Sequence, residues 1–219
     1  MMNDKKNPKV IVIVDAFRAF ATASYVLERK PQQYIYVTKS SVLTKLASNF
    51  SNPLFIGKNE IGENINYNIP NSPTRVTEVE VTGRVVMHRT EAGAKGILEA
   101  TDADVVLAAA FVNASATARY IRRLSEPKVT IIPMGHEAIK PSIEDDICAQ
   151  YIQFLINGKP FDLKPFIPEL KKGPGKYFFA KDQWQYPRED FKSFLETNRF
   201  NFAIRAELCE DYALLMVCK

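Results

Sequence analysis

The stretch VIVIV, Val10–Val14, decides the fold class of this chain. An unbroken run of β-branched residues is typical of a strand that is buried on both faces, as the strands of parallel sheets are. At Asp15 the pattern changes, because Phe17, Phe20 and Val26 follow at helical spacing. The sequence therefore predicts a buried strand that is followed by a helix.

The same alternation continues along the chain. Further strands are predicted at 34–37, 53–56, 84–87, 105–109 and 129–132, and helices at 40–50, 93–100, 113–124 and 142–156. Residues 57–73 are rich in asparagine and show little periodicity, so we expect a long loop there. Strand–helix alternation of this kind predicts an α/β fold, with a mostly parallel sheet and helices on both faces.

The composition changes after residue 158, where prolines and glycines interrupt the chain repeatedly. Beyond that point we expect a helix at 188–196 and strands at 202–206 and 213–217. A chain of 219 residues fits a single domain. We therefore expect an α/β core over 1–158 and a C-terminal α+β extension, 159–219, that packs on this core.

Charge and cysteine content argue against several classes of protein. The formal net charge is +4 and the basic residues are scattered, which argues against a nucleic-acid partner. Cys148, Cys209 and Cys218 show no CxxC spacing, which disfavours a disulfide framework or a zinc ribbon and favours a reducing cytoplasm. No apolar run approaches ~18 residues, so we expect no contact with a membrane. The sequence predicts a soluble cytoplasmic protein and leaves a homodimer open.

Polar side chains follow four of the predicted strands at the point where each strand ends. In open α/β sheets, ligands bind outside the carboxyl ends of the strands. The residues at these ends are Asp15, Arg18, His88, Arg89, Thr90, Gly93, Asn113, His136, Glu144, Asp145 and Asp146. Arginines and helix N-termini hold phosphate oxygens, and clustered carboxylates hold Mg²⁺. The set predicts a site for a small anionic phosphorylated substrate with a divalent metal.

Each of these residues also has a structural interpretation. Asp15 and Asn113 suit helix caps, and Arg18 suits an ordinary surface position. His88 and His136 stand alone in the sequence, and lone histidines are more often structural. The functional interpretation therefore depends on the shared edge of the sheet, since no residue is specific by itself.

Three acids, Glu144, Asp145 and Asp146, begin the helix predicted at 142–156. Ser142 and Asp145 approximate a capping box, and acids in a first turn offset the helix dipole. Neighbouring residues of a helix point ~100° apart. We expect Glu144 to approach a Mg²⁺ held near Asp15, Asp145 to complete the capping box, and Asp146 to be solvated.

Five segments resemble, in order, motifs of the 2-phosphosulfolactate phosphatases. The first, VIVIVDAFRAFATA (Val10–Ala23), is similar to the D-x-x-R-A opening of that family. The others are NSP (Asn71–Pro73), RTEAGAKGI (Arg89–Ile97), AAFVNASATA (Ala109–Ala118) and SIEDDICAQYI (Ser142–Ile152). The resemblance spans roughly residues 10–158, and the order of the motifs makes it more specific than any one of them.

The resemblance implies an α/β phosphatase fold, Mg²⁺ as cofactor, and a phosphoric monoester hydrolase that converts 2-phosphosulfolactate to sulfolactate and phosphate in coenzyme M biosynthesis. From the chemistry of the matching positions, we assign catalysis to Asp15, Glu144 and Asp145, with Asp15 and Glu144 as metal ligands. We assign substrate and phosphate binding to Arg18, Asn71, Arg89, Thr90, Gly93 and Asn113. Direct attack by water is favoured, and a phospho-aspartyl intermediate on Asp15 is the alternative.

Some positions depart from the family pattern. An aspartate and a glycine tend to precede the NSP motif, where this chain has Asn68 and Pro70, and a hydroxyl residue tends to follow the motif glycine, where it has Ala94. The loop at 58–63 also matches poorly. These departures motivate a second hypothesis, a non-catalytic relative that binds phosphate or sulfonate. A nucleotide-binding oxidoreductase is disfavoured because no GxGxxG follows a strand.

Overall fold

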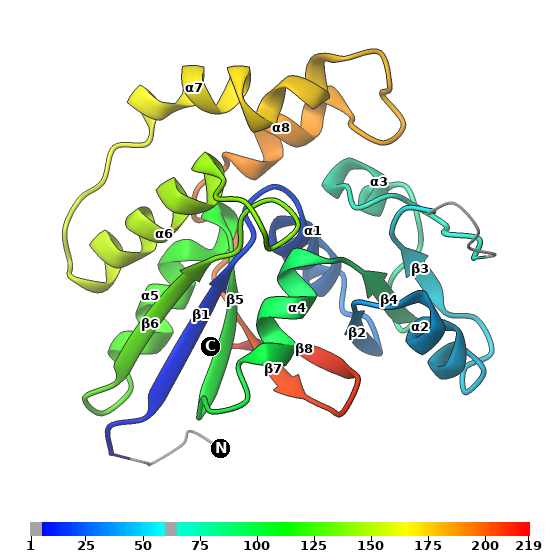
Figure 1. Cartoon of the computed structure of the whole chain (residues 1–219), viewed down its shortest axis with the longest axis horizontal. Coiled ribbons are helices and arrows are strands. Elements are labelled where there is room, and N and C mark those ends of the chain that lie inside the picture. The colour runs from blue at the N-terminus through cyan, green and yellow to red at the C-terminus, as the bar shows by residue number, and fades with distance from the viewer. Residues whose placement is uncertain (1–5, 60–64) are drawn as a thin grey trace.

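One mixed sheet organises the chain. The computed structural model describes residues 6–59 and 65–219, so part of the loop expected at 57–73 lies outside the described residues. The strands are β1 (Lys9–Val14), β2 (Gln33–Val37), β3 (Leu54–Ile56), β4 (Val85–Arg89), β5 (Val105–Ala109), β6 (Lys128–Pro133), β7 (Ala203–Leu208) and β8 (Tyr212–Cys218). Their order is β3-β4-β2-β8-β7-β5-β1-β6 (Figure 1). The predicted α/β fold with a mostly parallel sheet is confirmed.

The valine–isoleucine run forms β1, which has a parallel neighbour on each side. Val10 lies opposite Val105 of β5 and opposite Val129 of β6. All residues from Val10 to Val14 are buried, and full burial stabilises the fold by about 1.5–3 kcal/mol for each such side chain. Because both faces of β1 are buried, its sequence does not alternate between apolar and polar residues.

The last two strands lie inside the sheet. β7 pairs antiparallel with β5 and β8, and β8 pairs antiparallel with β2. This hairpin joins two parallel halves, β3-β4-β2 and β5-β1-β6. The C-terminal extension, 159–219, thus contributes two strands to the sheet itself, and without them β2 and β5 would each present an unpaired edge. A domain boundary at residue 158 stays a prediction.

Helices cover both faces of the sheet. They are α1 (Ala19–Glu28), α2 (Ser40–Ala47), α3 (Pro73–Thr77), α4 (Ala92–Glu99), α5 (Ala114–Arg122), α6 (Ile143–Ile156), α7 (Ile167–Lys172) and α8 (Arg188–Phe194). α4 crosses in front of the central strands, and α5, which packs against α6, lies behind β1 and β6 (Figure 1). In the described part of the chain, no helix has the length and apolar character needed to cross a membrane. The cytoplasmic location stays a prediction.

The segment that contains α7 and α8 lies over the edge where β1 and β6 end (Figure 1). The helix predicted at 188–196 is present as α8, whereas α3 and α7 were not predicted. Both are short and carry a proline in the first turn, Pro73 and Pro168 respectively. Proline is favourable there, because the first N–H groups of a helix have no partner within it. The proline-rich composition after residue 158 thus includes helix starts as well as breaks.

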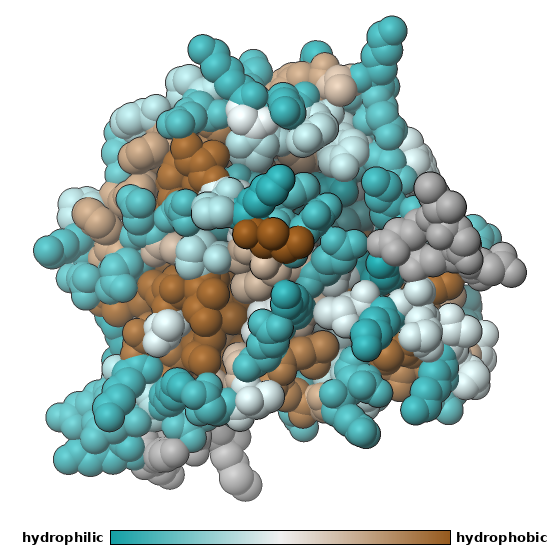
Figure 2. All heavy atoms as spheres, viewed as in Figure 1, coloured by the Kyte–Doolittle hydropathy of each residue, from teal (hydrophilic) through white to brown (hydrophobic). Residues whose placement is uncertain are grey.

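β6 forms one edge of the sheet and is only partly covered. Figure 2 shows hydrophobic surface over the region that β6 occupies in Figure 1. Ile132 of β6 and Phe154 of α6 are both exposed. An open edge strand is a feature through which two chains can pair, and the homodimer stays a prediction.

Candidate active site

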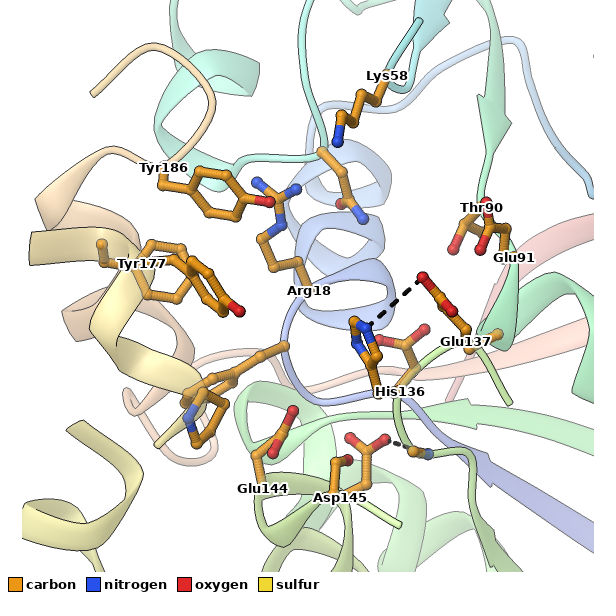
Figure 3. A pocket seen from close by; sticks show the side chains of 18 of the residues that line it. Arg18, Lys58, Thr90, Glu91, His136, Glu137, Glu144, Asp145, Tyr177 and Tyr186 are labelled. Carbon is orange, nitrogen blue, oxygen red and sulfur yellow. Dashed lines mark hydrogen bonds and ion pairs between the residues drawn. The ribbon is translucent and has the colours of Figure 1, made fainter. Parts of the chain in front are cut away.

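A pocket of about 930 Å³ lies where β1, β4 and β6 end. Figure 3 shows Glu144 and Asp145 along one side of it, with Thr90 and Glu91 facing two tyrosines of the C-terminal segment. The site residues predicted from the sequence that line this pocket are Asp15, Arg18, Asn71, Arg89, Thr90, Glu144 and Asp145. All of these except Asn71 come from the strand-end argument, which thus brought together the acids and arginines of the pocket.

Asp15 follows β1 directly and is 7% exposed. Its Oδ1 accepts a hydrogen bond from the N–H of Ala19, the first residue of α1, at 3.1 Å. Burial raises the pKa of Asp15, and the nearby N–H groups of Ala19 and Gly93 lower it in part. Asp15 thus holds the start of α1, as its structural interpretation predicted, and also lines the pocket.

Gly93 lies in the first turn of α4 and is buried, but it does not line the pocket. A Cβ atom at this position would lie 3.0 Å from Oδ2 of Asp15 and 2.9 Å from the ring of Phe20. Only a glycine therefore lets α4 approach Asp15 this closely. We assign Gly93 to the positioning of Asp15, in place of the direct substrate contact expected from the sequence.

Asp145 connects three segments of the pocket. Its Oδ1 accepts from the N–H of Ala16 at 2.7 Å, and its Oδ2 accepts from the N–H of Gly135 at 2.8 Å. Ser142 is the N-cap of α6 and makes no side-chain cap hydrogen bond. The predicted capping box is therefore wrong, because Asp145 points toward the loop after β1 instead of back to its own helix.

Glu144 lines the pocket beside Asp145, as predicted, and is 8% exposed. Burial raises the pKa of Glu144, and the negative charge of Asp15 raises it further. Burial also raises the pKa of Asp145 well above its usual range, with the charges of Asp15 and Glu144 acting in the same direction. Three buried acids thus disfavour one another's ionised forms at one place. Asp146 is half-buried and does not line the pocket.

Arg18 points into the pocket and is held by the C-terminal segment (Figure 3). One guanidinium nitrogen donates to the carbonyl of Gln185, and the group lies 4.3 Å from the centre of the Tyr186 ring. A further buried acid, Asp190, which lies outside the pocket lining, is close enough to Arg18 to interact with its charge. Arg18 is therefore a fixed cation of the pocket, so its alternative interpretation as an ordinary surface arginine is wrong.

Arg89, Thr90 and Asn71 complete the polar lining. Arg89 ends β4, and its guanidinium donates to the carbonyl of Lys58 at 3.4 Å and lies 3.8 Å from Glu91. Asn71 precedes α3, and its side-chain oxygen is buried without a hydrogen-bond partner in the described part of the chain. A buried amide group without a partner is costly, which is consistent with a ligand contact at Asn71.

Asn113 does not reach the pocket. It is fully buried, its side-chain oxygen accepts from the N–H of Ala110 at 2.9 Å, and its amide nitrogen donates to the carbonyl of Ala108 at 3.1 Å. These bonds shape the turn between β5 and α5. Asn113 occupies the N-cap position of α5, as its structural interpretation predicted, but its side chain makes no cap hydrogen bond. The assignment of Asn113 to substrate binding finds no place in this geometry.

The two histidines differ. His88 is fully buried in β4, its Nδ1 lies 2.8 Å from the Tyr34 hydroxyl, and burial lowers its pKa to about 3. It is therefore neutral and structural. His136 lines the pocket on the loop before α6, where its Nε2 lies 3.6 Å from a carboxylate oxygen of Glu137. From the sequence, both histidines had the same structural interpretation, because sequence alone does not distinguish a residue inside a buried strand from one at the edge of a pocket.

Sequence reasoning missed the contribution of residues 173–190. Tyr177 and Tyr186 line the pocket, and Gln185 holds Arg18. Asp190 is fully buried and accepts from the N–H of Thr74 at 2.9 Å and from its hydroxyl at 2.6 Å, which links α8 to α3. The one available signal was the density of aromatic residues in this segment, which does not by itself indicate a site.

The chain is similar to known proteins of one family. A family model described as 2-phosphosulpholactate phosphatase matches residues 1–199. A probable 2-phosphosulfolactate phosphatase of Thermus thermophilus is 31% identical over 160 residues, which cover 71% of this chain and 66% of that protein. A protein of the same name from Bacillus subtilis is 27% identical over 150 residues, 67% of this chain and 64% of the relative.

A third relative of that name, from Symbiobacterium thermophilum, is 29% identical over 144 residues, 64% of this chain and 60% of its own length. The matches thus span somewhat less than two thirds of each of these relatives. The family model itself covers most of the chain and all of the residues that line the pocket. The chain therefore belongs to the 2-phosphosulpholactate phosphatase family.

Proposed function

We propose that the chain is a Mg²⁺-dependent phosphatase that hydrolyses a small anionic phosphate ester, with 2-phosphosulfolactate as the first substrate to test. The observation that carries the proposal is the juxtaposition of the buried acids Asp15, Glu144 and Asp145 with Arg18 in one pocket. The names of the relatives point to the same substrate. A role in coenzyme M biosynthesis is part of this proposal.

The donor set fits Mg²⁺. Buried acids of like charge are unfavourable together unless protons or a cation compensate them. Asp15 and Glu144 would hold the ion, and Asp145 would instead bridge the backbone at Ala16 and Gly135. Among residues 6–59 and 65–219, no three His, Cys, Asp or Glu side chains form a group that could hold a metal. Mg²⁺ is compatible with fewer ligands, since it retains waters and substrate oxygens.

In the proposed reaction, the oxygen of a water molecule attacks phosphorus, the ester P–O bond breaks, and the departing alkoxide takes a proton. Bound Mg²⁺ would polarise the phosphoryl group and stabilise its charge. Arg18 and Arg89 bind the anionic groups of the substrate and do not transfer protons, because arginine stays protonated in the working range. Asp145 fixes the backbone at Ala16 and Gly135 and so holds the side chains of Asp15 and Glu144 in position relative to each other.

The test is release of phosphate from 2-phosphosulfolactate and from a generic aryl phosphate, with Mg²⁺, with EDTA, and with Mg²⁺ restored. We expect turnover that EDTA abolishes and Mg²⁺ recovers. Mg²⁺ should also raise the melting temperature, by about 2–4 °C for each kcal/mol of binding free energy. The paired variant Glu144→Gln should lose most of this shift, whereas Asp146→Asn should keep it. Metal-independent turnover would contradict the proposal.

The non-catalytic alternative predicts a different outcome of the same test, namely binding of phosphate without turnover. The structure gives a reason for one of the departures that motivated it. The side-chain oxygen of Asn68 accepts from the N–H of Phe55 at 2.7 Å, so Asn68 supports the start of β3. Ala94 is fully buried in α4 and does not line the pocket. Neither position removes a group that the proposed chemistry requires.

A further inference from the structure

The pocket is unusually large for a small sulfonated hydroxy acid. Its volume of about 930 Å³ lies near the upper end of the ~300–1,000 Å³ range of sites that enclose drug-sized ligands. The acids and arginines assigned above account for one side of it. The opposite side remains to be explained, and it belongs to the C-terminal segment (Figure 3).

That opposite side is mostly aromatic, and it also carries Lys176, whose Nζ lies 5.1 Å from the centre of the Tyr177 ring. Tyr177, Phe178 and Tyr186 all line the pocket, together with Pro174. The Tyr177 and Tyr186 rings are 5.6 Å apart between centroids and inclined by 31°, and Phe178 meets Tyr186 edge-on at 5.8 Å. We call Tyr177, Phe178 and Tyr186 the aromatic wall. Tyr186 also lies under Arg18, so the wall begins where the proposed phosphate-binding group ends.

The members of the aromatic wall differ in how far they are covered. Phe178 is buried, and it is packed against Phe191 and Phe194 of α8. Tyr177 is 49% exposed, although it lies at the pocket. A large exposed aromatic side chain at the rim of a concave site is a place where a ligand gains apolar contact. Tyr177 is therefore the residue of the wall that is available to a ligand.

The wall is held in place by contacts outside the pocket. Arg75 of α3 donates to the carbonyl of Gln183 at 2.8 Å, and its guanidinium lies 4.6 Å from the centre of the Trp184 ring. Asp190 binds Thr74 on the same short helix. The segment is thus tied to α3 on both sides of Tyr186, which fixes Tyr186, and the Tyr177 ring packs against it.

We infer that the organic part of the substrate is aromatic or similarly flat and apolar, and that Tyr177 contacts it while Arg18 and the buried acids handle the phosphate. This inference rests on the phosphatase activity of the proposed function, and it replaces 2-phosphosulfolactate by an aromatic ester as the preferred substrate. It predicts that the preferred ester is bulkier than 2-phosphosulfolactate.

The test compares the binding of two non-hydrolysable probes, methylphosphonate and benzylphosphonate. They share the phosphonate and differ by a phenyl ring. Their affinities are measured by titration calorimetry at saturating Mg²⁺. We expect benzylphosphonate to bind about tenfold more tightly, the scale of one good aromatic contact. Tyr177→Ala should lower this ratio several-fold, and Tyr177→Phe should retain it. Phe154→Ala, which removes an exposed aromatic side chain outside the pocket, should leave the ratio unchanged.

The outcomes separate the two proposals. Equal affinity for the two phosphonates in the wild type overturns the inference about the aromatic wall, and phosphate release from an alkyl ester would then still uphold the phosphatase. A preference for benzylphosphonate that survives Tyr177→Ala also overturns the role of Tyr177. Failure of the wild type to bind either phosphonate or to release phosphate from any ester contradicts both proposals. Benzyl-selective binding without turnover upholds the wall and contradicts the phosphatase.

Discussion

The buried carboxylates at and near the pocket of Arg18 fall into two sets, one acid by itself and a cluster of three, which differ in their neighbours. Asp190 is a single acid whose Oδ1 accepts from the N–H and the hydroxyl of Thr74. Burial raises its pKa, and hydrogen bonds and the charge of Arg18 lower it in part. Asp15, Glu144 and Asp145 lie together at the pocket, where burial raises the pKa of each. One group connects two helices, and the other concentrates negative charge beside a cavity.

The difference teaches how to separate structural from functional acids. A single buried carboxylate with good hydrogen bonds is compatible with a purely structural role. A cluster of acids that raise one another's pKa lowers stability when ionised, and such clusters occur where function requires them. The comparison predicts that substitutions of Asp15 and Glu144 alter turnover, whereas substitutions of Asp190 alter mainly stability.

The largest effect is expected for Asp15→Asn. It keeps the shape of the side chain and removes the charge that we assign to metal binding. Turnover should fall on the order of 100-fold or more, as when other electrostatic partners of a transition state are removed. Steady-state kinetics at saturating Mg²⁺ measures this, with circular dichroism to confirm folding. Wild-type rates in this variant would contradict the functional role that distinguishes the cluster at Asp15 from Asp190.

Asp145→Ala should come next, and its main effect should be on stability. Two N–H groups, of Ala16 and Gly135, lose their acceptor. An unpaired buried donor costs about 1–3 kcal/mol, so we expect a loss of about 2 kcal/mol in chemical denaturation. Asp146→Ala is the matched control on the same turn. A stability equal to that of the wild type would show that relief of charge repulsion offsets the lost hydrogen bonds.

A smaller effect is expected for Asp190→Asn. The amide oxygen can still accept from Thr74, but the negative charge beside Arg18 is lost. We expect about 1 kcal/mol of destabilisation, and a rise in KM that exceeds any fall in kcat. Glu189→Gln, at an exposed neighbour on α8, is the control. A fall in kcat as large as that of Asp15→Asn would place Asp190 with the catalytic acids.

The smallest effect is expected for Asp146→Ala, which should change stability by within about 0.5 kcal/mol, as surface substitutions generally do. Asp146 is adjacent to Asp145 but does not line the pocket. Thermal melts and kinetics on this variant check the rotation of α6. Loss of activity here, with an active Glu144→Ala, would mean that the wrong acid of the three faces the metal.

The sequence by itself determined the alternation of strands and helices and the acids and arginines that meet at the pocket. Val10–Val14 could be recognised as a doubly buried strand because burial on both faces removes polar alternation. Asp15, Arg89 and Glu144 could be placed at one edge because parallel strands end on the same side of a sheet. These inferences combine local sequence patterns with one rule of topology, namely that the carboxyl ends of parallel strands lie at the same edge of a sheet.

Only the tertiary structure decided which way each side chain points and which distant segments meet. Asp145 bonds to Ala16 and Gly135 in place of Ser142, and Asn113 turns into its own loop. The hairpin β7–β8 enters the middle of the sheet, and Tyr177 and Tyr186 arrive at a pocket whose first residue is Asp15. Contacts between residues so far apart along the chain leave no period or motif in the sequence, because they are set by packing of the whole fold.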